Sequence, residues 1–230
     1  MSETNAVQPD LPGLFPLPPA AAAAAASRAE DACHSPFAGH LPANRPTSTG
    51  QTGAQLTVGT LHSVIQLATW PTGVQAWESV LAHALGQPAP QKTGDIQATK
   101  LGLALRVGPE ELLLISDDAT QPPSAETVNK LRESVRPDIG SVLELSHARC
   151  RIRIEGERCV DALSKLFALD FREQAFAIGK LKLSSHHHVP CPLHRTGTAT
   201  FDAYVFTTYA REILETTADA ALEYGLTATE

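Results

Sequence analysis

The stretch VLELSHARCRIRIEG, residues 142–156, decides how the second half of this chain folds. Cys150, Ile152 and Ile154 alternate with three arginines, Arg149, Arg151 and Arg153. An apolar–polar alternation with a period of two predicts an antiparallel strand that is buried on one face. Leu143 and Leu145 have the opposite parity, so the pattern slips at 146–148. A slip of one position predicts a bulge or a tight turn there.

The same order of elements is predicted twice along the chain. In the second half, a strand at 149–155 leads into a helix with Val160 and Leu163, two strands follow at 188–194 and 200–206, and a last helix ends at Gly225. In the first half, the corresponding elements are a strand at 60–69, a helix from 74 to 85, strands at 101–107 and 111–116, and a helix after Ser124. The expected fold class is therefore α+β, with two packed β-α-β-β-α repeats. We expect the halves at 57–139 and 140–230, preceded by a disordered Pro/Ala-rich tail at 1–56.

Composition restricts the function and the compartment. The chain has 230 residues, 43% hydrophobic content and a net charge of -7. Such a chain is globular, and its acidity argues against a nucleic-acid partner. Neither a segment of about 20 apolar residues nor a signal peptide is recognisable, which predicts a cytoplasmic protein without a membrane span. Four cysteines, at 33, 150, 159 and 191, are then expected to be reduced, with Cys150 and Cys159 as small buried side chains.

The arginine face of the predicted strand is the first candidate site. Arg149, Arg151 and Arg153 on one face could bind an anion or an acidic partner surface, or could form a solvated sheet face. The neighbouring pair Ser146 and His147 suggests a nucleophile and its base. However, adjacent strand residues point to opposite faces, which argues against catalysis there.

A histidine-rich run is the second candidate site. His188, Cys191 and His194 have the spacing H-x2-C-x2-H, and such ligands suit zinc. In an extended strand, however, Cys191 would point away from the two histidines, so the sequence favours an edge strand with exposed histidines over a metal site. No glycine-rich nucleotide motif, Walker A sequence or C-x-x-C pair occurs in the chain, so nothing predicts a nucleotide or flavin site on it.

Several short matches, in order, resemble a known family. They are Glu144 to Arg149, where that family has an acidic-Leu-Ser-His-small-Arg stretch, then Ile154 to Gly156, Leu169 to Phe171, Phe176 to Gly179, Leu193 to Arg195, Phe201 to Val205 and Tyr209 to Arg211, with a looser match at Arg106 to Leu114. Together they resemble the gamma subunit of bacterial heterotetrameric sarcosine oxidase, over about residues 59 to 226.

The resemblance implies a fold and a set of partners. It implies an aminomethyltransferase-like, folate-binding type of fold, in a subunit that has no catalytic residue of its own and contacts an alpha subunit directly, beside beta and delta subunits. It also implies a complex that oxidatively demethylates sarcosine, or a related N-methyl amino acid, to glycine. The one-carbon unit passes to tetrahydrofolate. FAD, FMN, NAD, tetrahydrofolate and zinc are implied on the partner subunits and none on this chain.

Three functions therefore remain open from the sequence. The first is a non-catalytic gamma subunit of a sarcosine oxidase-like complex. The second is a stand-alone folate-binding protein of the aminomethyltransferase type, with Arg149, Arg151 and Arg153 as candidate contacts. The third is a metal-dependent enzyme that uses residues 186–194.

Overall fold

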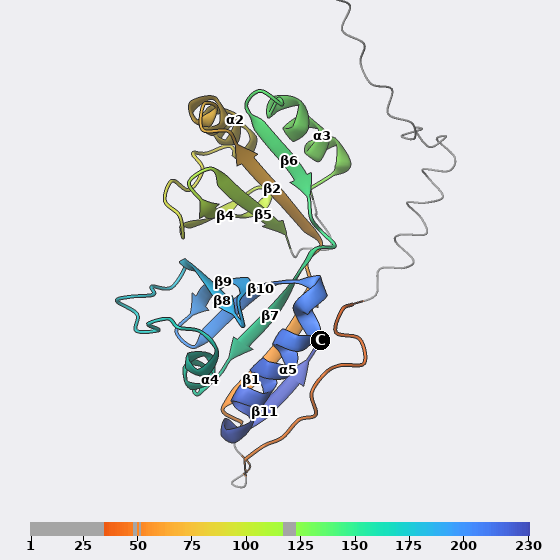
Figure 1. The fold of residues 1–230 in the computed structure, drawn as a ribbon, viewed down its shortest axis with the longest axis vertical. Helices are drawn as coiled ribbons and strands as arrows, with labels where there is room; N and C mark the ends of the chain where they lie inside the picture. Colours follow the sequence, from red (N-terminus) through yellow and green to blue (C-terminus); the bar gives the residue numbers. More distant parts are fainter. Residues whose placement is uncertain (1–34, 48–49, 51, 117–122) are drawn as a thin grey trace, which may run out of the picture. The chain divides into compact units, whose positions relative to one another are not determined.

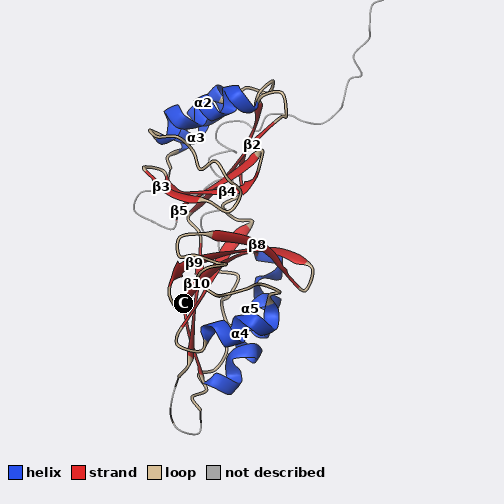
Figure 2. Ribbon diagram, turned by 90° about the vertical axis from the view of Figure 1, so that its left-hand side faces the viewer, coloured by secondary structure: helices blue, strands red, loops and turns tan. Residues whose placement is uncertain are grey.

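The computed structural model describes residues 35–47, 50, 52–116 and 123–230. Its strands form two sheets, and each sheet carries two helices on one face (Figures 1 and 2). The five-stranded sheet and its helices come from β2 (Ser63–Thr69), α2 (Val74–Leu85), β3 (Ile96–Thr99), β4 (Gly102–Gly108), β5 (Glu111–Ser116), α3 (Ala125–Ser134) and β6 (Gly140–Glu144). Its strand order is β3-β4-β5-β2-β6.

The six-stranded sheet holds the second half of the chain and one strand from the first. Its elements are β1 (Ala54–Thr60), β7 (Arg149–Glu155), α4 (Cys159–Leu166), β8 (Leu181–His186), β9 (Val189–Gly197), β10 (Thr200–Phe206), the short helix η1 (Thr207–Tyr209), α5 (Ala210–Ala221), the short helix η2 (Leu222–Tyr224) and β11 (Leu226–Thr229). Its strand order is β11-β1-β7-β10-β9-β8. The mixed α+β class expected from the sequence is thus present.

The repeated unit is longer than the β-α-β-β-α order expected from the sequence. Each half follows the order β-α-β-β-β-α-β, as β2 to β6 and as β7 to β11. The additional strands are β3 and β6 in the first half and β8 and β11 in the second. Of these, β3 and β11 have only four residues each, and the burial pattern of β8 does not alternate. Sequence periodicity therefore gives no signal for them.

The chain passes between the two sheets at two points. One is at 61–62, within the single strand expected at 60–69, so that β1 and β2 belong to different sheets. The other is the turn at 146–148, where the apolar pattern slips. β1 pairs antiparallel with β7 and parallel with β11, although it lies far from both in sequence (Figure 1). The boundary expected between residues 139 and 140 falls at the start of β6, before the second of these points.

The segment before β1 corrects the expected extent of the tail. Phe37 is fully buried in the core of the six-stranded sheet, and the Arg45 amide donates to the Leu226 carbonyl at 2.8 Å. Ala54 and Leu56 are also fully buried, in β1. The expectation of disorder is therefore wrong for 35–47 and 52–56, because one aromatic anchor in a Pro-rich stretch leaves no periodicity to read. The other parts of the expected tail, 1–34, 48–49 and 51, lie outside the described residues.

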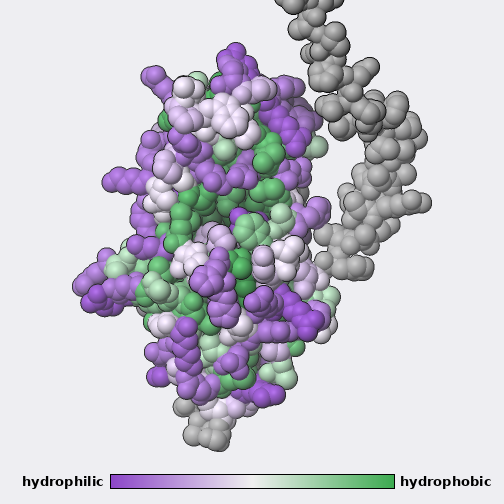
Figure 3. Space-filling model, in the orientation of Figure 1, coloured by the Kyte–Doolittle hydropathy of each residue, from purple (hydrophilic) through white to green (hydrophobic). Residues whose placement is uncertain are grey.

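Three apolar clusters hold the fold. One lies between the six-stranded sheet and α4 and α5, and there Cys150, Ile152 and Ile154 are each 1% exposed, as the alternation predicts. A second lies between the five-stranded sheet and α2 and α3. A third joins the sheets and contains Leu61, Val64, Leu105, Leu113, Ile115, Leu181 and Tyr204. Figure 3 shows apolar side chains gathered in the region of β4 and β5, the strands that supply three residues of this third cluster.

Buried cysteines add to the first cluster. Cys150, Cys159 and Cys191 are free and at most 1% exposed, and Cys33 lies outside the described residues. Burial raises the pKa of Cys150 and of Cys191 to about 12 and that of Cys159 to about 11. These thiols therefore stay protonated at neutral pH and pack as small apolar side chains, as expected for Cys150 and Cys159.

A matching arginine closes one hairpin in each half. In the β4–β5 hairpin, Arg106 donates to the carbonyls of Gly108 and Pro109, and in the β9–β10 hairpin Arg195 donates to those of Gly197 and Thr198. Each guanidinium also lies over an aromatic ring, at 4.8 Å from Trp77 and 5.3 Å from Phe201. The sequence R-x-G thus plays the same structural role at the same place in both halves.

Candidate functional site

The outer face of the six-stranded sheet, opposite α4 and α5, carries the arginines singled out in the sequence. In β7 these residues alternate with the buried row, and their cross-strand neighbours are fixed by the register. Arg149 lies opposite Phe206, Arg151 opposite Tyr204, and Arg153 opposite Asp202. The three guanidinium groups start from one face but have different surroundings.

Arg153 forms a two-point ion pair. Its Nε and Nη2 donate to the two carboxylate oxygens of Asp202 at 2.7 and 2.8 Å. The Asp202 side chain is 4% exposed and that of Arg153 is 33% exposed. A carboxylate this deeply buried requires a cation beside it, because an unpaired buried charge is strongly unfavourable. This arginine therefore balances a charge inside the fold.

A second polar pair lies beside Asp202 in the sheet, because His194 is the cross-strand neighbour of Asp202. His194 Nδ1 lies 3.3 Å from the Tyr204 hydroxyl, and both residues are buried. Burial lowers the pKa of His194, Arg153 lowers it further, and the nearby Asp202 carboxylate opposes both effects. The ring is therefore neutral at neutral pH. Tyr204 belongs to the cluster that joins the sheets, so this pair lies at that boundary.

Arg149 is the least satisfied of the three arginines. Its guanidinium carbon lies 3.7 Å from the centroid of the Phe206 ring, and burial lowers its pKa while Glu111 of β5 opposes that shift. Among the described residues, its buried Nε and Nη1 have no hydrogen-bond partner. Arg151 lies beside Gly59, where an added Cβ would be 3.9 Å from Nη2. A partner or anion contact for the three arginines stays a prediction.

Ser146 and His147 lie in the turn that carries the chain from one sheet to the other. The Ser146 hydroxyl accepts from the Val64 amide at 3.2 Å, and the Thr207 hydroxyl donates to the His147 carbonyl at 2.9 Å. The Ala148 amide donates to the Leu145 carbonyl at 2.9 Å and closes the turn. The turn predicted from the phase slip is thus present, and these contacts serve to position it.

The histidine-rich run forms the β8–β9 hairpin. His188 lies in the two-residue turn, whereas Cys191 is fully buried in the core and His194 faces the other way. Within the described ranges, no group of three or more His, Cys, Asp or Glu residues is placed to hold a metal ion. The strand at the sheet edge is β8, and β9 lies between β8 and β10, so the expected edge strand is displaced by one position in the sheet. The expectation of exposed histidines is wrong for His186 and His194, which are 1% and 7% exposed.

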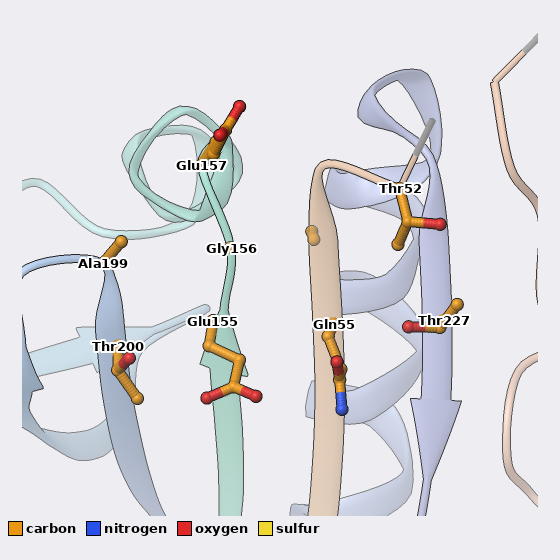
Figure 4. A pocket seen from close by; sticks show the side chains of 9 residues that line it. Thr52, Gln55, Glu155, Gly156, Glu157, Ala199, Thr200 and Thr227 are labelled. Atoms are coloured by element: carbon orange, nitrogen blue, oxygen red, sulfur yellow. The ribbon is translucent and has the colours of Figure 1, made fainter. Parts of the chain in front are cut away.

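An open depression of about 600 Å³ lies at the far end of the same sheet (Figure 4). Its lining comes from β1, β7, β10, β11 and the adjoining turns and consists of Thr52, Ala54, Gln55, Glu155, Gly156, Glu157, Ala199, Thr200 and Thr227. Two carboxylates with hydroxyl and amide groups would suit a cation or a polar neutral surface rather than an anion. Its residues come from segments far apart in sequence, so no sequence motif predicts this depression.

None of the described helices is long and apolar enough to cross a membrane. A scan of protein-family models finds no match to the chain.

Three curated relatives resemble the chain in sequence, all of them gamma subunits of sarcosine oxidase. The subunit from Arthrobacter sp. is 26% identical over 149 residues, which are 64% of this chain and 71% of that protein. The subunit from Corynebacterium sp. strain P-1 is 30% identical over 120 residues, 52% of this chain and 57% of that protein. The subunit from Corynebacterium sp. strain U-96 is 24% identical over 148 residues, 64% and 70% respectively.

Two solved structures resemble the fold. A chain of heterotetrameric sarcosine oxidase from Corynebacterium sp. U-96, in complex with pyrrole 2-carboxylate, matches with a TM-score of 0.70 and 22% identity, over 83% of this chain and 95% of that chain. The glycine cleavage system aminomethyltransferase T from Bartonella henselae matches with a TM-score of 0.55 and 13% identity, over 78% and 48%. The resemblance predicted from the sequence is thus confirmed: in sequence the chain is similar to sarcosine oxidase gamma subunits, and its fold is that of a chain of heterotetrameric sarcosine oxidase.

Proposed function

We propose that this chain is the gamma-type subunit of a sarcosine oxidase-like complex. The observation that carries the proposal is the agreement of two comparisons. The gamma subunit from Arthrobacter sp. aligns with 64% of this chain at 26% identity, and the fold matches 95% of a chain from a heterotetrameric sarcosine oxidase. The shared fold, which covers nearly the whole of that chain, supports a role as a subunit. We assign alpha, beta and delta subunits as the partners and the cytoplasm as the compartment.

The proposal includes a structural rather than a catalytic role. This role is supported by the polar side chains that the sequence singled out, because they make contacts within the fold. Arg153 pairs with Asp202, His194 lies beside Tyr204, and the Ser146 hydroxyl accepts from a backbone amide. A nucleophile or base would need to present its polar atom to a substrate instead. We therefore assign the chemistry to the partner subunits.

The reaction of the complex is part of the same proposal. Sarcosine, or a related N-methyl amino acid, is oxidatively demethylated to glycine, and the one-carbon unit passes to tetrahydrofolate. FAD, FMN, NAD, tetrahydrofolate and zinc belong to the partner subunits, and no residue of this chain is assigned to them. Arg149 and Arg151, with Arg153 beside them, are proposed to contribute to the surface that contacts the alpha subunit.

Purification of the tagged full-length chain from its native host tests this role. The expected result is that a flavoprotein with sarcosine-oxidising activity co-purifies with the chain at a fixed ratio through size-exclusion chromatography. A tagged chain that elutes as a lone monomer, while the flavoprotein activity elutes elsewhere, would contradict the proposal. An untagged strain is the control for non-specific retention.

The similarity to an aminomethyltransferase supports a second candidate, a stand-alone folate-binding protein. Calorimetric titration of the isolated full-length chain with tetrahydrofolate separates the two. The gamma-subunit proposal expects no heat of binding beyond dilution. Saturable one-to-one binding that is lost in an Arg149→Ala, Arg151→Ala double variant would favour the second candidate instead.

A further inference from the structure

The end of the β8–β9 hairpin has a backbone conformation that its residues disfavour. His186 pairs with Val189 across a two-residue turn, in which His187 has φ 45° and His188 has φ 70°. Two consecutive positive φ values mark a type I′ turn, which strongly prefers Asn-Gly because a Cβ is strained there. In the part of the chain that the structure describes, these are the only non-glycine residues with positive φ.

The hairpin end is held against the helices by His186. This side chain is 1% exposed, and its ring lies edge-on to that of Phe167 with 5.7 Å between centroids. His186 Nε2 is 3.1 Å from the Thr216 hydroxyl of α5. Because that hydroxyl donates its hydrogen to the Glu212 carbonyl at 2.9 Å, it accepts from His186. The Thr216 contact fits a ring with a proton on Nε2, and the burial of the ring against Phe167 favours the neutral form, which has no second proton.

Two titratable groups face His186. The His187 ring is stacked beside it with 4.4 Å between centroids, and His187 Nδ1 is 4.0 Å from a Glu212 carboxylate oxygen. Burial lowers the pKa of His186, His187 lowers it further, and Glu212 opposes both effects. On the side of α4, His186 contacts the apolar ring of Phe167, the residue that directly follows this helix. A second proton on His186 is therefore disfavoured while the hairpin end is packed.

We propose that the end of the β8–β9 hairpin separates from α5 when His186 is protonated. The charged ring regains water by leaving the contact with Phe167 and Thr216, and separation also relieves the backbone strain at His187 and His188. The opening stays local, because β9 remains paired with β10 and β8 with the rest of β9. This device is independent of the proposed subunit role.

Hydrogen–deuterium exchange on the full-length chain tests the proposal. After correction for the intrinsic pH dependence of exchange, opening at 186–189, the end of the hairpin, should rise by up to about tenfold per pH unit below the ordinary histidine pKa of about 6.5. The β4–β5 hairpin has no histidine and serves as the internal reference. Opening at 186–189 that is unchanged between about pH 7.5 and about pH 5.5 would overturn the proposal.

Two variants assign the effect to His186. His186→Phe keeps an aromatic ring against Phe167 but has no proton to gain, so its opening should not depend on pH. The double variant His187→Asn, His188→Gly relaxes the turn and keeps His186, so it should open less at neutral pH and still open more as the pH falls. A His186→Phe protein with the wild-type pH dependence, or a double variant with none, would contradict the role of His186.

Discussion

Arg153 balances the charge of the buried Asp202 carboxylate within the six-stranded sheet. Arg153→Met leaves the Asp202 carboxylate buried and unpaired, which should cost about 3 kcal/mol of unfolding free energy. Asp202→Asn leaves an arginine that is already one third exposed, so it should cost less. Urea denaturation of the two variants measures this order.

A matched control for the Arg153 variant lies on α5. Arg211 pairs with Glu215 at the surface, where both side chains are more than half exposed. Arg211→Met should therefore cost only about 0.3–0.5 kcal/mol, as exposed i,i+4 pairs do. Equal losses in Arg153→Met and Arg211→Met would show that the Arg153 pair is a surface pair in solution.

Buried histidines make stability depend on pH. The pKa of His194 is lowered in the folded protein, so the unfolded chain binds the extra proton first. The contribution of neutral His194 to the free energy of unfolding is therefore fully present above the unfolded pKa of about 6.5. It is lost as the pH falls below that value. The urea midpoint should decrease between about pH 7.5 and about pH 5.5, and His194→Gln should decrease less. A wild-type midpoint that rises over this interval would contradict the assignment.

Among the structural elements, the β4–β5 and β9–β10 hairpins share an arginine whose guanidinium donates to carbonyls of its own hairpin. The Arg195 guanidinium donates to four backbone carbonyls, those of Gly197, Phe171, Phe176 and Thr198, and lysine cannot reach them together. Arg195→Lys should cost about 3 kcal/mol, or about 6–12 °C in Tm for a chain of this size. Thermal unfolding followed by circular dichroism measures the shift. Arg172→Lys, at an exposed position, should leave Tm nearly unchanged.

The elements that the sequence predicted share a strong period. β7 has alternate residues buried, and α2 and α5 bury one stripe each, so local pattern and packing agree. β3, β8 and β11 form because neighbouring strands offer pairing partners, which is a tertiary effect without a local signal. Phe37 was missed for the same reason, since only the assembled core defines its place.

The candidate site was less predictable than the fold. Alternation placed Arg149, Arg151 and Arg153 on one face, but it carries no information on what lies opposite them. Asp202 neutralises one arginine and Phe206 lies under another, and both belong to β10, some 50 residues away in sequence. The histidine run has metal-like spacing, but strand geometry sends Cys191 into the core. The pairing of strands that are distant in sequence therefore determines the surroundings of these side chains, and the short motifs carry no information on it.

At the scale of the whole molecule, the central claim is that this chain works as a subunit. The two sheets are joined through one apolar cluster, and the fold matches nearly all of a chain from a heterotetrameric sarcosine oxidase. The sequence similarity to gamma subunits indicates which kind of subunit this chain resembles. A subunit of this kind should have a fixed stoichiometry in its complex, whereas an independent folate-binding protein should not.

The most direct test is the mass of the complex. The chain is co-expressed with the alpha, beta and delta subunits encoded in its own host, and the product is analysed by size-exclusion chromatography with light scattering. The account predicts one peak that contains one copy of each subunit, carries flavin absorbance and oxidises sarcosine or a related N-methyl amino acid. A fully assembled, active flavoprotein peak without this chain, with the chain eluting alone as a monomer, would contradict the claim.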